Sequence, residues 1–215
     1  MRFLILTLTA ALAAWGAPAA AGSAVKTTVF KSNFESGLPA GLDAGVGEVT
    51  GVQGYEGLAY GTRQFSGQML RSPTGNVVTL TLQNLPAHRH LGVDFLFAAI
   101  DSLDGTGTFP SGDFFHVKVD GVSVFRESFA NATESQVQSY TPSKPGFVLA
   151  RRVDLGFSQG TYYLDSAYYL GGEKRLKRIS HTGSSAVITF EIEGEGIQPL
   201  SDESWGMDAL KVYVY

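Results

Sequence analysis

Hydrophobic and polar residues alternate with a period of two through most of this chain. The alternation is clearest in residues 78–82, 115–119, 188–192 and 210–214, where every second residue is Val, Leu, Ile or Phe. Such a pattern is typical of β-strands that bury one face and expose the other to water. We therefore predict strands in these four segments. No stretch of the sequence shows the sustained period of a helix.

Residues 91–100 are apolar at nearly every position, which predicts a central strand that is covered on both faces. Clusters of Gly, Pro, Asp and Ser, such as residues 105–112 and 142–146, separate the predicted strands and are typical of turns. Many short strands, glycine-rich turns and the lack of alternating strands and helices favour an all-β fold, specifically a two-sheet antiparallel jelly-roll sandwich.

The first residues have the features of an export signal. Arg2 provides a positive start, residues 3–15 are mostly apolar, and three alanines end at Ala21. We predict a signal peptide at residues 1–21 that is cleaved, and a single sandwich domain at residues 22–215. The apolar run is shorter than the roughly 20 residues of a membrane span, and no second run follows. We therefore expect a mature chain without a membrane span, secreted to the periplasm or the exterior.

Composition narrows the classes of partner. The 215 residues carry a formal net charge of −4, and the basic residues are scattered except for a short run at residues 174–178, which is typical of a solvated turn. This distribution argues against nucleic-acid binding. The chain contains no cysteine. An exported domain of this kind has no disulfides to stabilise it, so its stability must come from its core, from strand pairing and from any metal that it binds.

Several short motifs occur in a distinctive order along the chain. They are Phe-Glu-Ser-Gly at 34–37, Leu-Pro-Ala-His at 85–88, Val-Asp-Phe-Leu at 93–96, Ile-Asp-Ser-Leu-Asp-Gly at 100–105, Phe-His-Val-Lys-Val-Asp-Gly at 115–121 and Asp-Glu-Ser-Trp-Gly-Met-Asp at 202–208. This order resembles a group of secreted bacterial jelly-roll proteins that are similar to concanavalin-like and carbohydrate-binding-module sandwiches. The resemblance covers nearly the whole chain after the leader. It implies a fold, but says little about activity.

Two groups of carboxylates are candidate calcium ligands, because calcium takes about six to eight oxygen ligands from carboxylates and carbonyls. Glu35 and Asp208 lie near opposite ends of the chain, and pairing of the first and last strands would bring them together; the resemblance implies a structural calcium there. Asp101, Asp104 and Asp113 flank a loop of Gly, Thr and Ser. The alternative is that aspartates in such loops only cap turns.

Tyrosines are the candidate ligand-binding residues. Tyr162, Tyr163, Tyr168 and Tyr169 form a tyrosine-rich stretch, and exposed aromatic rings stack on the apolar faces of sugars. Neighbouring tyrosines on a strand point to opposite faces, so at most half of them are expected to be exposed. The alternative is that these rings fill the core.

Catalytic patterns are weaker. Residues 156–160 match the G-x-S-x-G pattern of hydrolase nucleophiles, but strand-like residues follow where that nucleophile needs a helix. Glu191, Glu193 and Glu195 alternate on one strand face, as solvated residues do, and the paired-glutamate signature of jelly-roll glycosidases is absent. The sequence therefore favours a protein that is not an enzyme.

The resulting hypothesis is a secreted, calcium-stabilised module that binds carbohydrate or another component of the extracellular matrix or envelope. One alternative is a structural or adhesive envelope protein without a small-molecule site. The other is a polysaccharide hydrolase or lyase.

Overall fold

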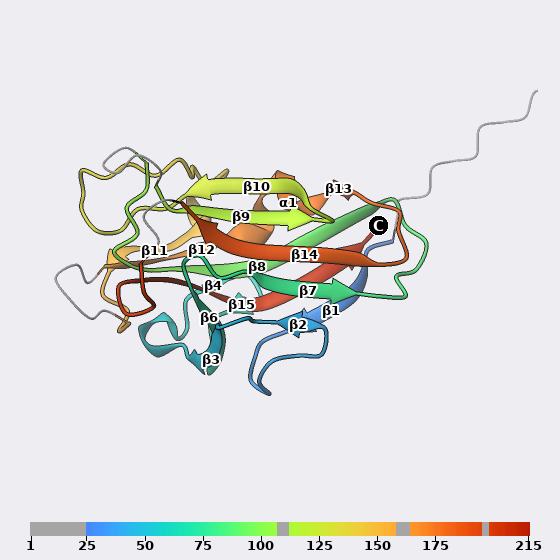
Figure 1. The fold of residues 1–215 in the computed structure, drawn as a ribbon, viewed down its shortest axis with the longest axis horizontal. Helices are drawn as coiled ribbons and strands as arrows, with labels where there is room; N and C mark the ends of the chain where they lie inside the picture. The colour runs from blue at the N-terminus through green and yellow to red at the C-terminus, as the bar shows by residue number, and fades with distance from the viewer. Residues whose placement is uncertain (1–24, 107–111, 158–163, 195–197) are drawn as a thin grey trace, which may run out of the picture.

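The computed structural model describes residues 25–106, 112–157, 164–194 and 198–215. The predicted signal peptide (residues 1–21), Ser158, Tyr162, Tyr163 and Glu195 lie outside the described residues. In the described part, two antiparallel sheets pack face to face, which confirms the all-β sandwich (Figure 1). No helix in this part is long and apolar enough to cross a membrane.

The larger sheet has eight strands. Its order is β11 (Val148–Val153), β12 (Asp165–Tyr169), β8 (His90–Asp101), β15 (Glu203–Val214), β6 (Gln68–Pro73) and β3 (Glu48–Gly51), with β1 (Thr27–Ser32) beside β15 and β13 (Ile179–Ser180) beside β8. The five-stranded sheet has the order β10 (Val122–Ser128), β9 (Phe114–Val119), β14 (Ala186–Glu193), β7 (Val78–Leu82) and β2 (Leu42–Asp43). Successive strands from β6 to β9 alternate between the two sheets, as in a jelly roll.

The remaining elements are short. Strands β4 (Ala59–Tyr60) and β5 (Arg63–Gln64) pair only with each other. The described helical elements are α1 (Lys174–Lys177) and the 3-10 turns Gln53–Tyr55, Pro145–Phe147 and Leu170–Gly172. All four are a single turn long, in line with a sequence that lacks a helical period.

Strand β8 is buried on both faces, as its sequence predicts. Phe95 and Phe97 face the five-stranded sheet, where Phe97 and Phe115 have ring centroids 4.3 Å apart. Leu96 and Ile100 belong to a second apolar cluster, which lies under residues of the 3-10 turn at Gln53–Tyr55 and of the loops beside it. The centre of the larger sheet is therefore apolar on both sides, and polar sites form at its ends and edges.

The first and last strands pair, also as predicted. Strand β1 runs antiparallel to the second half of β15, with Thr27 opposite Val214 and Ser32 opposite Leu210. The first half of β15 instead pairs with β6, with Met207 opposite Leu70. Between the halves the register shifts, and Ala209 has a φ of 52°. Such a bulge redirects the side chains next to it, and Asp208 is one of them.

Candidate functional site

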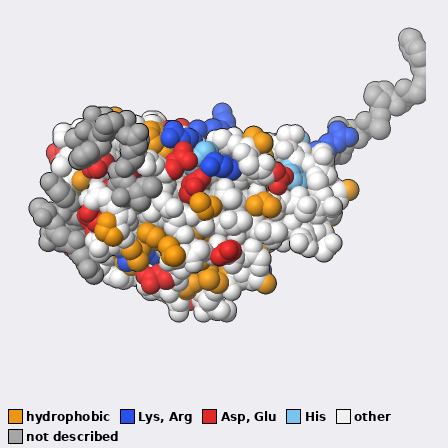
Figure 2. Space-filling view, in the orientation of Figure 1, with side chains coloured by type: hydrophobic (Ala, Val, Ile, Leu, Met, Phe, Trp, Pro, Cys, Tyr) orange, Lys and Arg blue, Asp and Glu red, His pale blue; other side chains and the backbone are white. Residues whose placement is uncertain are grey.

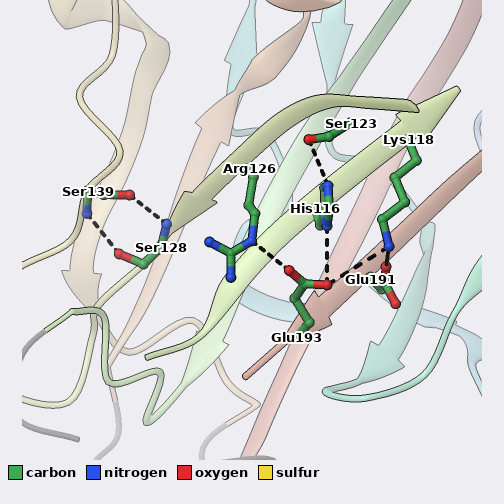
Figure 3. Close-up of polar contacts among 8 residues, drawn as sticks. All are labelled: His116, Lys118, Ser123, Arg126, Ser128, Ser139, Glu191 and Glu193. Carbon is green, nitrogen blue, oxygen red and sulfur yellow. Dashed lines mark hydrogen bonds and ion pairs between the residues drawn. The ribbon is translucent and has the colours of Figure 1, made fainter. Parts of the chain in front are cut away.

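The outer face of the five-stranded sheet carries a network of charges. In Figure 2, acidic, basic and histidine side chains gather over this sheet. Figure 3 shows the network at close range: Lys118 Nζ lies 2.5 Å from Glu191 Oε1, Arg126 Nε lies 2.6 Å from Glu193 Oε1, and His116 Nδ1 lies 3.2 Å from Glu193 Oε2.

These ion pairs occupy the carboxylates that a glycosidase would need. Burial alone would raise the pKa of Glu193, but hydrogen bonds from Arg126 and His116 outweigh it and lower the pKa. A carboxylate held ionised in this way is poorly suited to act as a general acid. Glu191 and Glu193 do share one strand face, as predicted, but they are half-buried in the network rather than freely solvated.

The two described tyrosines of the tyrosine-rich stretch point in opposite directions. Tyr168 is 0% exposed and packs in the core against Phe129 and Tyr140, so its ring is not available to a ligand. Tyr169 faces outward and stacks on Tyr60, with ring centroids 4.4 Å apart and an interplanar angle of 11°. Tyr169 is thus the one described member of this stretch that fits a binding role.

Tyr169 also lines a cavity of about 200 Å³ on the outer face of the larger sheet. Its lining includes two tyrosines of the last strand region, a buried ion pair and a lysine: Tyr213, Tyr215, Arg63, Asp94 and Lys26. Sequence reasoning missed these residues. Tyr213 and Tyr215 alternate with the buried Val212 and Val214, and this period-two aromatic pair was the signal that could have revealed them.

Arg63 and Asp94 form the polar centre of this cavity. Arg63 donates from Nε to Asp94 Oδ1 at 3.3 Å and from Nη2 to Asp94 Oδ2 at 2.5 Å. Arg63 Nη2 also donates to the Tyr213 hydroxyl at 2.6 Å. Two parallel hydrogen bonds fix both planar groups in a defined orientation, and both residues line the cavity.

Basic residues surround the cavity. Two further hollows, of about 400 and 580 Å³, adjoin it through shared lining residues and add Lys31 and Lys211. Burial and then the positive charges of Arg63, Lys177 and Lys211 lower the pKa of Lys26, although Asp94 opposes them. We call the three hollows together the β15 groove. Its excess of positive charge contrasts with the net charge of −4 of the whole chain.

The predicted pair Glu35 and Asp208 meets at one loop. The backbone N–H of Ser66 donates to Asp208 Oδ2 at 3.1 Å, and the N–H of Gln68 donates to Glu35 Oε1 at 3.3 Å. Between them, the N–H of Gly67 donates to Glu56 Oε2 at 2.9 Å. Burial raises the pKa of Asp208 to about 7, with a further contribution from the negative charges of Glu35 and Glu56. We call these three carboxylates the terminal clasp.

Of the second predicted group, Asp104 and Asp113 come together, but Glu203 takes the place of Asp101. Asp104 and Asp113 are joined by Glu203, and ligand atoms of the three residues all lie within 4.8 Å of one another. Asp101 is not in this group; its backbone N–H donates to Asp165 Oδ1 at 2.9 Å. No spacing along the chain marks Glu203, because it joins the aspartates only through the pairing of β15 with β8.

The comparisons with known proteins assign neither a family nor a function. No protein-family model and no curated protein matches the chain. Two similar solved structures are a GH115 4-O-methyl-α-glucuronidase, BtGH115A, with specificity for decorated arabinogalactans, and the N-terminal CBM22 tandem domain of Xyn10C from Paenibacillus barcinonensis.

Both similarities are distant. The glucuronidase is 13% identical with a TM-score of 0.41, and the match covers 94% of this chain and 19% of the glucuronidase. The tandem domain is 16% identical with a TM-score of 0.36, and the match covers 90% of this chain and 47% of the tandem. The chain thus spans less than half of either protein, and TM-scores at this level carry no conclusion about its ligand.

Proposed function

We propose that this chain is a secreted, non-enzymatic module that binds carbohydrate in the β15 groove and is stabilised by calcium at the terminal clasp. The observation that carries the proposal is the cavity in which Tyr169, Tyr213 and Tyr215 surround the Arg63–Asp94 pair. Aromatic rings provide apolar surfaces for sugar rings, while a few fixed polar groups orient the hydroxyls. Tyr215 is the ring proposed to stack on the sugar, because Lys26 Nζ already lies 3.4 Å over the Tyr213 ring and Tyr169 stacks on Tyr60.

The size of the cavity suits a small unit of a longer ligand. At about 200 Å³, it is smaller than the roughly 300–1,000 Å³ of pockets for drug-sized molecules. The two adjoining hollows extend it along β1 and β15. The groove therefore fits an extended chain in which one sugar enters the cavity and its neighbours lie in the hollows.

The charge of the groove favours a carboxylated polysaccharide. Lys26, Lys31 and Lys211 have no carboxylate within ion-pairing distance among the described residues. A uronic acid in the chain would supply carboxylates to these lysines, and charge complementarity of this kind adds specificity and speeds association. A component of the extracellular matrix or envelope that carries such sugars fits the same description.

The binding test compares polygalacturonic acid with neutral xylan, using titration calorimetry. We expect the acidic polymer to bind more tightly, and its binding to weaken as salt is added. Tyr215→Ala should weaken binding about tenfold or more, equivalent to about 1.4 kcal/mol. The control is Phe114→Ala, which removes a half-buried ring from the outer face of the other sheet and should leave binding unchanged.

The same titration separates the alternatives. Equal losses in Tyr215→Ala and Phe114→Ala would contradict the β15 groove as the site. Binding of neither polymer would remove the carbohydrate proposal and leave the structural or adhesive envelope protein. Release of reducing ends from either polymer would instead support the enzyme.

A further inference from the structure

A cluster of three carboxylates lies at the end of the sandwich where the loop after β8 meets the start of β15. Asp104 follows β8, Asp113 immediately precedes β9, and Glu203 is the first residue of β15. Asp113 is 2% exposed and Glu203 is 0% exposed. Three acidic groups from separate segments are thus gathered largely out of water.

Only neutral donors satisfy these carboxylates within the described residues. Asp113 Oδ2 accepts the backbone N–H of Asp104 at 2.7 Å, and Asp104 Oδ1 accepts the side-chain amide of Gln136 at 2.5 Å. Glu203 Oε1 accepts the amide of Gln198 at 3.1 Å. None of the ion pairs among the described residues brings a Lys or Arg to the cluster.

One oxygen of the cluster has no partner. Glu203 Oε2 is fully buried and makes no hydrogen bond with any described residue. A buried oxygen without a donor loses the solvation that it had in water, and three neighbouring carboxylates without a counterion also repel one another. A cation bound among them would supply both the missing ligand contact and the missing charge.

The spacing fits one ion. Oxygens that are each 2.3–2.6 Å from a common calcium lie at most about 5.2 Å apart, and the ligand atoms of these three residues lie within 4.8 Å. Magnesium demands a nearly ideal octahedron, whereas calcium accepts irregular ligand sets from loops and strand ends. The set here is irregular and consists of oxygens, which favours calcium.

We propose that Asp104, Asp113 and Glu203 bind a calcium ion that joins the residues directly after β8 and directly before β9 to the start of β15. This site is separate from the terminal clasp, whose Asp208 lies further along β15 beside the bulge. It does not depend on the proposed carbohydrate binding. Its structural effect would be to hold the loop after β8, where Asp104 also forms a bridge to Ala130.

The test measures calcium bound to the full chain after chelator treatment, by calorimetry and elemental analysis. The key variant is Glu203→Gln, which keeps the shape of the side chain while removing its charge. We expect at least a tenfold loss of affinity at one site, and a bound stoichiometry reduced by one ion per chain. Asp104→Asn, at a less buried position, should produce the same loss and serves if Glu203→Gln fails to fold.

A matched control separates metal binding from folding. Glu127→Gln alters a half-buried glutamate outside the cluster, which is paired with Arg175, and should leave the calcium stoichiometry unchanged. Glu203→Gln should melt below the wild type in calcium, but not in chelator. If Glu203→Gln binds as many calcium ions per chain as the wild type, and as tightly, the proposal is overturned. We expect Asp208→Asn, which alters the terminal clasp, to leave calcium binding at Asp104, Asp113 and Glu203 unchanged.

Discussion

At the scale of single residues, Asp94 is the least expected feature of the chain. It interrupts the apolar run of residues 91–100 in strand β8, and its side chain is largely buried. Its position is explained by Arg63, whose guanidinium binds both carboxylate oxygens, and by Tyr213, whose hydroxyl donates to Oδ2 at 3.3 Å. Asp94 therefore stabilises the larger sheet and also orients the polar centre of the β15 groove.

We predict that Asp94→Asn lowers the free energy of unfolding by about 3 kcal/mol, because removing one partner of a largely buried ion pair leaves the other charge uncompensated. Urea denaturation measures the change. Arg175→Gln is the control, since Arg175 is 46% exposed in its pair with Glu127 and should cost less than about 1 kcal/mol. Similar losses in both variants would show that Asp94 has no special role.

At the scale of elements, the period-two pattern located the strands well where their registers are regular. The segments at 78–82, 115–119 and 188–192 coincide with β7, β9 and β14 to within two residues. The last strand was predicted to start at Leu210, yet β15 begins at Glu203. The bulge at Ala209 breaks the alternation of apolar and polar residues. The first half of β15, which pairs with β6, therefore does not continue the period-two pattern of the second half.

The two groups of carboxylates differ in how far the sequence alone predicts which residues come together. The meeting of Glu35 and Asp208 in the terminal clasp follows from one topological assumption, that the end strands pair, whereas Glu56 was not predicted to join them. The cluster of Asp104, Asp113 and Glu203 requires the register of β15 against β8, in which Glu203 lies opposite Asp101. No local pattern encodes that register. Likewise, Arg63 and Asp94 lie on separate strands, and only folding shows that they form a pair.

At the terminal clasp, we predict that millimolar calcium raises the melting temperature. Asp208→Asn or Glu35→Gln should remove most of the increase that calcium bound at the clasp provides. A ligand that binds only the folded state stabilises it by about 2.7 kcal/mol at a hundredfold excess over its dissociation constant. Calorimetric melting of metal-free protein, with and without calcium, measures it. The control is Asp154→Asn, which alters the residue directly after β11 and outside both carboxylate groups. This variant should keep the full increase in melting temperature, and an equal loss in it would contradict the assignment.

At the scale of the whole molecule, the buried acids share one electrostatic property. Burial is the largest cause that raises the pKa of Asp113 and of Asp165 to about 6, of Asp208 to about 7 and of Glu203 to about 9. All four values lie above those of the unfolded chain, which are near 4. The folded protein therefore binds these protons more tightly than the unfolded chain does.

The sign of the pH dependence follows by linkage. Stability from these four acids is fully present below about pH 4 and is lost as the pH rises through their folded pKa values, between about 6 and 9. For Asp165 alone, a rise of about two pK units corresponds to about 3 kcal/mol. Above neutral pH, the metal-free protein must keep several buried carboxylates charged.

We therefore predict that metal-free protein melts at a higher temperature at pH 5.5 than at pH 8.5, and that calcium stabilises it far more at pH 8.5. The reason is that calcium binds ionised carboxylates, so at low pH it must first displace their protons. Melting curves at both pH values, in chelator and in millimolar calcium, provide the four numbers needed. The double variant Glu203→Gln with Asp208→Asn should flatten both the pH dependence and the calcium response. A chelated protein that melts higher at pH 8.5 would mean that the acid clusters are not the main determinant of its stability.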